Sequence, residues 1–208
     1  KYGKVINFTS QGQGPLVQWI RKRFAALGKN ALPDACVTPI YLSGELMNGL
    51  IPEIAKISAY ARGERITKGD IDAVAAPILE AQVFEMTGAV SKGDFNKAAA
   101  VLGDLLRQQE EPFMLLALMG KELRKLYTAR LALDTGKDKF WLMEQWNMRS
   151  DYPAKLLLDN ARRVSREWCA MAVRRCYETD LRIKSVNSVD GAQELKLLLM
   201  ELEQGARA

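Results

Sequence analysis

The chain has 208 residues, of which 48% are hydrophobic and 26% are charged, and its formal net charge is +5. This length and composition are typical of a soluble globular protein with one large or two small domains. No apolar run approaches the roughly 20 residues of a membrane-spanning helix, and the N-terminus lacks the pattern of a signal peptide, so we expect a cytoplasmic protein. Because the first residue is Lys1 and not methionine, we also expect a fragment or a processed product.

The first third of the chain predicts a short strand followed by a small helical domain. Val5–Phe8 is a β-favouring run, and we interpret it as the last strand of a sheet whose other strands lie upstream. A helix is predicted from Pro15 to the closing Gly28, with one apolar face. Two further helices are predicted at 34–42 and 45–60, the second opened by Ser43–Gly44 and carrying Leu46, Leu50, Ile54, Ile57 and Tyr60 on one face.

A capped helix is predicted next. Thr67 and Asp70 stand at the two positions of a reciprocal capping pair, with aspartate where glutamate is commoner. The helix that they begin should end by Pro77. A short helix after a longer one is also typical of a helix-turn-helix, so a DNA-binding reading of 43–77 stays open.

From Leu79 onward the pattern predicts one helix after another. The long segment 113–133 has apolar residues wide around its circumference, which indicates burial on more than one side, as a central bundle helix or a subunit contact requires. The predicted helices are 79–90, 94–109, 113–133, 140–146, 152–164, 166–184 and 189–202. In the helix 166–184, the residues expected to point inward are Trp168, Met171, Ala172, Cys176 and Leu181.

The residue types exclude the common catalytic and metal sites. Histidine is absent, which removes histidine-based catalytic triads and every metal site that needs imidazole. The cysteines Cys36, Cys169 and Cys176 form no CxxC pair, so we expect reduced, buried thiols and no structural zinc. No GxxxxGK(S/T) phosphate-binding loop occurs. The sequence therefore predicts no catalytic residue, no cofactor and no metal ion.

Positive charge is clustered. Residues 1–33 contain no acid and six basic residues, which are Lys1, Lys4, Arg21, Lys22, Arg23 and Lys29. A second basic cluster runs from Arg162 to Lys184, diluted by three acids. Clustered cations bind the phosphate backbone of nucleic acids through counterion release, but a solvated helix face is the alternative for both clusters.

The segment from Gly93 to Pro112 carries the most informative pattern. It begins at a glycine turn, continues through a helix with an apolar stripe and ends at Glu111–Pro112. With Lys97–Ala98 and its paired leucine, the segment resembles the third domain of the delta subunit of the bacterial DNA polymerase III clamp loader. Other landmarks similar to that family follow the same order along the chain, at 53–60, 66–71, 120–126, 152–153, 161–163 and 180–185.

This resemblance implies an all-α fold. Residues 1–10 would be the end of an ATPase-like domain of the AAA+ superfamily, leaving a remnant strand at the N-terminus. Residues 11–78 would form a small helical lid-like domain, and residues 79–208 a helical collar domain for oligomerisation.

The resemblance also implies a non-catalytic subunit that takes part in loading the sliding clamp onto primed DNA during DNA replication. The holoenzyme that it serves would be a DNA-directed DNA polymerase, which is a nucleotidyltransferase. The implied partners are the ATPase and delta-prime subunits of the loader, DNA in the assembled complex, and the sliding clamp through an N-terminal domain that this chain lacks. No membrane and no cofactor are implied.

Six residues are candidate contacts. Arg21, Lys22 and Arg23 are expected near DNA phosphates in the assembled loader. Lys121 and Arg124 match two basic positions of the family, and they are expected, with Lys184, to contact neighbouring subunits. Salt-bridged or solvated surface positions are the alternative for each of them.

Two other functions stay open. One is an all-α helix-turn-helix DNA-binding regulator. Against it, the helix that would enter the DNA groove carries two acidic residues, Asp70 and Asp72, which are poorly suited to that role. The other is an ATPase of the same superfamily that is cut before its nucleotide site. The four tryptophans are expected in the core and not as platforms for stacked bases; they are Trp19, Trp141, Trp146 and Trp168.

Overall fold

The computed structural model describes residues 3, 11–44, 46–148, 150–185 and 190–207. These residues form eleven α-helices and one pair of two-residue strands, which confirms the all-α fold class. The predicted strand at 5–8 lies outside the described residues. The chain divides into two compact units between Ile78 and Leu79, each with its own hydrophobic core.

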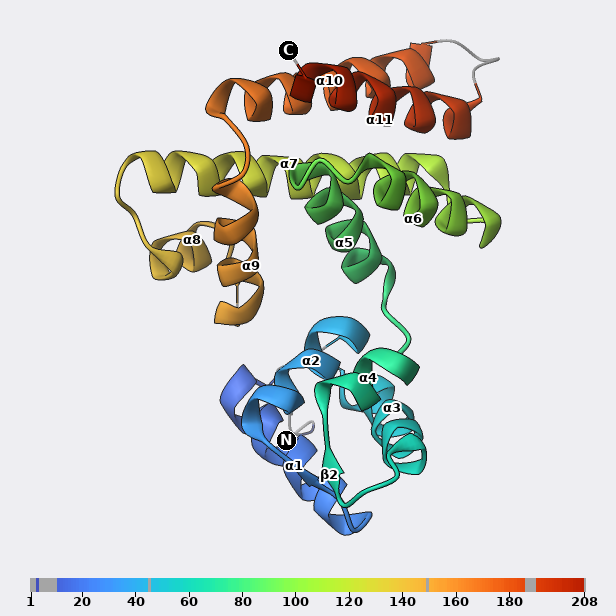
Figure 1. The fold of residues 1–208 in the computed structure, drawn as a ribbon, viewed down its shortest axis with the longest axis vertical. Helices are drawn as coiled ribbons and strands as arrows, with labels where there is room; N and C mark the ends of the chain where they lie inside the picture. The colour runs from blue at the N-terminus through green and yellow to red at the C-terminus, as the bar shows by residue number, and fades with distance from the viewer. Residues whose placement is uncertain (1–2, 4–10, 45, 149, 186–189, 208) are drawn as a thin grey trace. The chain divides into compact units, whose positions relative to one another are not determined.

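The first unit consists of four helices and the strand pair (Figure 1), and all four helices contribute side chains to one core. Its fully buried side chains include Leu16, Ile20 and Phe24 from the first helix, spaced on one face as the sequence predicts. The elements are α1 (Gln13–Ala26), β1 (Asn30–Ala31), α2 (Pro33–Ser43), α3 (Met47–Tyr60), β2 (Arg65–Ile66) and α4 (Lys68–Val74).

The parallel pairing of β1 with β2 is a feature that the sequence did not predict. Asn30 pairs with Arg65 and Ala31 with Ile66, so the segment after α1 and the segment before α4 are joined side by side. Gly28, with φ of 72°, ends α1 in the left-handed conformation that glycine adopts without strain, and it turns the chain into β1.

The start of α3 corrects the sequence analysis. Ser43–Gly44 closes α2 and does not open α3, because Gly44 has φ of 84° and α3 begins only at Met47. Leu46 therefore precedes the helix and is 73% exposed, so its assignment to the buried face was wrong. Tyr60, the last residue of α3, is also exposed.

The predicted cap at Thr67 is confirmed. The Thr67 backbone N–H donates to Asp70 Oδ2 at 2.8 Å, and the Asp70 N–H donates to Thr67 Oγ1 at 3.2 Å. The Thr67 hydroxyl also donates to Asp70 Oδ2, at 2.6 Å, and this bond first and that of the Thr67 N–H second lower the pKa of Asp70. The helix they begin, α4, buries Ile71 and is only seven residues long.

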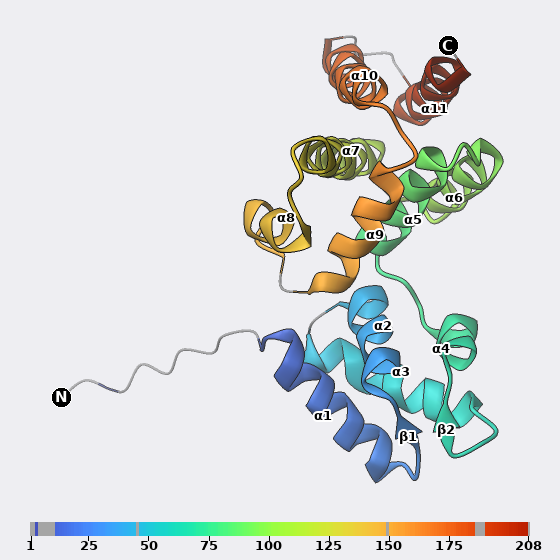
Figure 2. The same cartoon turned by 60° about the vertical axis from the view of Figure 1, so that its left-hand side comes forward.

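The second unit is a bundle arranged around one long helix (Figures 1 and 2). Its central helix α7 contacts α5, α8, α9, α10 and α11, and its buried residues lie on more than one side, as the wide apolar surface predicted. The helices are α5 (Leu79–Ser91), α6 (Phe95–Arg107), α7 (Pro112–Asp134), α8 (Lys139–Gln145), α9 (Asp151–Ala161), α10 (Arg166–Ser185) and α11 (Gly191–Arg207).

The turn into α6 explains the pattern that carried the resemblance. Gly93 has φ of 76° and ends the preceding helix, and Asp94 Oδ1 then caps α6 by accepting from the Lys97 N–H at 3.0 Å. Pro112 stands in the first turn of α7, where its missing N–H costs nothing. Each of these residues is therefore needed by the local backbone.

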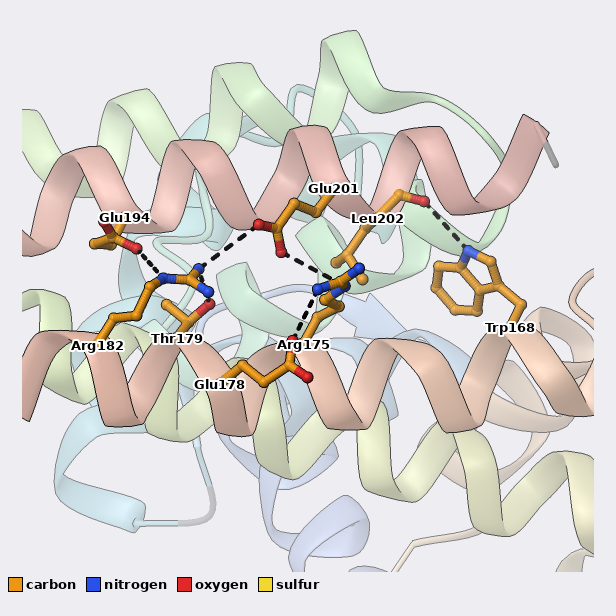
Figure 3. A network of polar contacts seen from close by, with 8 residues as sticks. All are labelled: Trp168, Arg175, Glu178, Thr179, Arg182, Glu194, Glu201 and Leu202. Carbon is orange, nitrogen blue, oxygen red and sulfur yellow. Dashed lines mark hydrogen bonds and ion pairs between the residues drawn. The ribbon is translucent and has the colours of Figure 1, made fainter.

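Helices α10 and α11 lie side by side and are joined by polar contacts as well as by leucines (Figure 3). Arg182 Nε donates to Glu194 Oε2 at 2.7 Å. Glu201 lies between Arg175 and Arg182, with a nitrogen of each 3.8 Å from one of its oxygens. The buried residues of α11 are Leu195, Leu198, Leu199 and Leu202. Leu181, predicted to point inward from α10, is instead 45% exposed.

Candidate functional site

The described residues contain no cluster of histidine, cysteine or acidic side chains suited to a metal ion. Cys36, Cys169 and Cys176 are free and buried. Burial raises the pKa of the Cys36 thiol to about 11 and those of Cys169 and Cys176 to about 12, so almost none is thiolate at neutral pH. These thiols are packing groups.

A hollow of about 670 Å³ lies beside α1 in the first unit, and we call it the α1 hollow. Two of the three predicted DNA-proximal residues, Arg21 and Lys22, line it, and both are exposed. The remaining lining residues are Gln18, Ala25, Gly28, Lys29, Asn30, Ala31 and Glu64.

Arg23, the third predicted DNA-proximal residue, does not line the α1 hollow. Its guanidinium carbon is 5.3 Å from the centroid of the Trp19 ring, a cation–π contact on another face of α1. Consecutive residues of a helix point about 100° apart, so the first and the third of three consecutive cations point to opposite sides. Two neighbouring cations can border one hollow, but all three cannot. The structure therefore brings Arg21 and Lys22 together at the hollow and separates Arg23 from them.

A groove of about 530 Å³ lies between α7 and α10 in the second unit, and we call it the α7–α10 groove. Its lining residues are Leu116, Ala117, Gly120, Arg124, Val173, Cys176, Tyr177 and Asp180. On the same two helices, Phe113, Met114, Tyr177 and Leu181 are exposed large hydrophobic residues. The groove therefore has apolar lining residues, and further exposed apolar residues lie on the two helices that form it.

The three predicted subunit-contact residues lie at this groove or next to it in the helices that form it. Arg124 lines the groove, and its charge partly offsets the effect of burial on the Cys176 pKa. Lys184 pairs with the lining residue Asp180 at 2.7 Å. Lys121, one residue after the lining residue Gly120, is exposed and has no side-chain partner in the described part of the chain.

Sequence reasoning missed the exposed apolar residues of the groove. Tyr177 is 62% exposed, and it lies one turn after Val173 on α10. The only sequence signal was helical periodicity, which cannot distinguish an apolar residue in the core from an exposed one that a partner protein covers. The contribution of Asn30 to the α1 hollow was also missed, because it depends on the β1–β2 pairing. That of Gln18 was missed too, although its spacing to Arg21 and Lys22 on α1 was a usable signal.

Comparison with known proteins identifies the family. Residues 80–202 match the family model of the DNA polymerase III delta subunit, C-terminal domain, which is more than half of the chain. The chain belongs to this delta subunit family. None of these matches supports the alternative that the chain is a helix-turn-helix DNA-binding regulator.

Two delta-subunit relatives agree with the family match. The DNA polymerase III subunit delta of Bacillus subtilis (strain 168) is 24% identical over 157 residues, which is 75% of this chain and 45% of the relative. The probable DNA polymerase III subunit delta of Aquifex aeolicus (strain VF5) is 25% identical over 153 residues, 73% of this chain and 44% of the relative. The chain therefore spans less than half the length of these delta subunits.

A solved structure agrees in fold. The Bacillus subtilis DNA clamp loader delta protein superposes with a TM-score of 0.73 at 20% identity, covering 94% of this chain and 57% of that chain. Within the described residues, no helix combines the length and the apolar character needed to cross a membrane.

Proposed function

We propose that this chain is the lid-like and collar portion of a clamp-loader delta subunit, a non-catalytic part of the assembly that loads the sliding clamp onto primed DNA. Residues 11–78 would act as the lid-like domain and residues 79–208 as the collar, through which the loader subunits associate. Family membership supports this assignment, as does the division of contacts between Ile78 and Leu79.

The α7–α10 groove is the main structural support for the proposed subunit contact. Phe113 is 49% exposed and Tyr177 62% exposed, and both lie on helices that form the groove. A soluble monomer rarely gathers large apolar side chains on one surface, and such a patch marks a protein–protein contact. We therefore assign the groove to a neighbouring loader subunit.

Charges at the margin of the groove fit this role. Lys121 and Arg124 carry two positive charges along one side of α7, and Lys184 adds a third from α10, although Asp180 partly neutralises it. Charged residues at the rim of an interface steer association and select partners more than they add affinity. The partner surface is expected to present carboxylates around an apolar centre.

The wider assembly completes the proposal. The direct partners would be the ATPase and delta-prime subunits. DNA would lie near Arg21 and Lys22, and Arg23, which contacts Trp19, would lie outside this DNA contact. The sliding clamp would be contacted by an ATPase-like AAA+ domain outside this chain. The complex would serve the DNA polymerase holoenzyme, a nucleotidyltransferase, in the cytoplasm, and this chain would itself catalyse nothing.

The test is assembly in solution. The chain is mixed with the ATPase and delta-prime subunits of its own source and followed by size-exclusion chromatography with light scattering, with a longer delta subunit of the same source as the control. Co-elution in one complex supports the collar role. If the longer subunit assembles and this chain does not, then these two units are not sufficient for ring formation, and the proposal for this chain fails.

A further inference from the structure

We propose that the α1 hollow is a binding site for the phosphodiester backbone of a nucleic acid, held by Arg21, Lys22 and Lys29 with the amides of Gln18 and Asn30. DNA as the biological polymer rests on the proposed function. The site itself rests on the geometry and charge of the hollow.

The geometry begins with helical spacing. Gln18, Arg21, Lys22 and Ala25 follow one another at steps of three, one and three residues, so α1 presents an amide and two cations along one face. Ala25 and Gly28 are small, and no atom lies within 4 Å of the position of a Cβ on Gly28. The hollow is therefore open where a phosphate must enter.

Lys29 supplies a fixed positive charge. Its Nζ donates to the backbone oxygens of Ala61 at 2.7 Å and Gly63 at 2.8 Å, so the ammonium is already held before any ligand arrives. An ammonium has three N–H donors, and two are used here, which leaves one for a ligand oxygen. A cation positioned in advance loses little conformational entropy on binding.

The charge balance favours an anion. The described lining residues include three cations and one carboxylate, that of Glu64. The side chains of Arg21 and Lys22 form no hydrogen bond or ion pair with the part of the chain that the structure describes. Two exposed arginines, Arg62 and Arg65, flank Glu64 in the chain. Positive charge without internal partners therefore exceeds negative charge at this site.

The lining chemistry favours nucleic acid over an acidic peptide. Arginine, lysine, asparagine and glutamine are the side chains that contact phosphate oxygens in protein–DNA complexes. Among the described lining residues none has a large apolar side chain, so the hollow offers no apolar pocket for the side chains of a peptide. A phosphodiester chain needs only the charges and amides that are present.

The test compares variants of this chain in binding a fluorescently labelled primed-template DNA, followed by anisotropy over a series of salt concentrations. The double variant Arg21→Gln/Lys22→Gln should weaken binding about tenfold and reduce the slope of log K against log salt by about 2, because two phosphate contacts are lost. Arg23→Gln is the matched control on the same helix, and it should change affinity by less than about twofold. Glu64→Gln should tighten binding, since it removes a negative charge from the hollow.

The outcomes separate this inference from the proposed function. The inference is overturned if the wild-type chain does not bind the DNA at low salt, if the double variant binds like wild type, or if Arg23→Gln weakens binding equally. It is also overturned if polyglutamate binds as tightly as the DNA at equal salt. Assembly of the same proteins with the loader subunits is measured in parallel. DNA binding without assembly supports the DNA site in the α1 hollow and argues against the collar role. Assembly by a double variant that has lost DNA binding supports both.

Discussion

The indole nitrogen of Trp168 donates a hydrogen bond to the backbone oxygen of Leu202 at 3.3 Å, across 34 positions of the chain (Figure 3). Trp168 lies in the first turn of α10 and is buried, and Leu202 lies in the second half of α11. The contact therefore joins the last helix to the bundle at the end of the helix pair opposite the Arg182–Glu194 ion pair.

Trp168→Phe removes this hydrogen bond and leaves a small void, while it keeps an aromatic ring in the core. We expect the free energy of unfolding to fall by about 1–3 kcal/mol. Urea unfolding followed by circular dichroism measures the change. Arg182→Met, which removes the partly exposed ion pairs with Glu194 and Glu201, should cost no more than about 1 kcal/mol. A larger loss for Arg182→Met than for Trp168→Phe would contradict this ranking.

Gly88 on α5 and Asn160 on α9 make a second close contact. A Cβ on Gly88 would lie 3.1 Å from Asn160 Nδ2, and Asn160 is buried. Gly88→Ala gains helix propensity but crowds this amide, so we expect a net destabilisation of about 0.5–2 kcal/mol. Gly103→Ala on α6 is the control, because its Cβ meets only the end of Arg107 at 3.5 Å and should stabilise by about 0.5–1 kcal/mol. Thermal unfolding that shifts both variants in the same direction would refute this account.

Asp151 links α8 to α9 and makes the second unit sensitive to acid. Its Oδ2 accepts from Lys139 Nζ at 2.6 Å and pairs with Lys155 Nζ at 2.8 Å. These contacts, that of Lys139 first, lower the pKa of Asp151 from its ordinary value of 3.8. A depressed pKa in the folded state contributes stability that is full above the unfolded pKa and is lost as the pH falls through the folded pKa.

Asp151→Asn should therefore be less stable than the wild type by a constant amount above about pH 5, and the difference should shrink below about pH 4. Urea midpoints measured at several pH values from neutral to acid test this expectation. A difference between the two proteins that grows on acidification would have the wrong sign and would exclude this role for Asp151.

The three thiols report on the two units separately. With pKa values raised to about 11 and 12 by burial, none of the cysteines should react with a disulfide reagent in the native protein. Under rising urea, Cys36 should become modified when the first unit opens, and Cys169 and Cys176 when the second opens. Mass spectrometry of the labelled peptides identifies each thiol. Rapid labelling of any of them without denaturant would contradict the burial described here.

The sequence predicted what local chemistry controls. The Thr67–Asp70 cap, the glycine turn at Gly93 and the broad burial of α7 follow from short patterns whose physical cause lies within a few residues. The resemblance to the delta subunit came from several such patterns in order, and the family match confirms it.

The sequence did not predict features that depend on distant contacts. The β1–β2 pair joins Asn30 to Arg65, and two-residue strands leave no periodic pattern. Helical periodicity placed Leu181 in the core, yet it is exposed on one of the two helices that form the α7–α10 groove. The division of Arg21, Lys22 and Arg23 between two faces follows from helix geometry, but the hollow beside two of them needed the folded chain.

The most direct measurement for the collar role is the assembly of Tyr177→Glu with the ATPase and delta-prime subunits. Tyr177 lines the α7–α10 groove and is 62% exposed, so the variant should fold normally but place a charge in the proposed interface. Phe140→Glu is the matched control, because Phe140 is 63% exposed on α8 and does not line the groove. We expect Tyr177→Glu to lose about 2 kcal/mol or more of association free energy and Phe140→Glu to assemble like the wild type. Equal assembly of both variants would show that the groove is not the subunit contact.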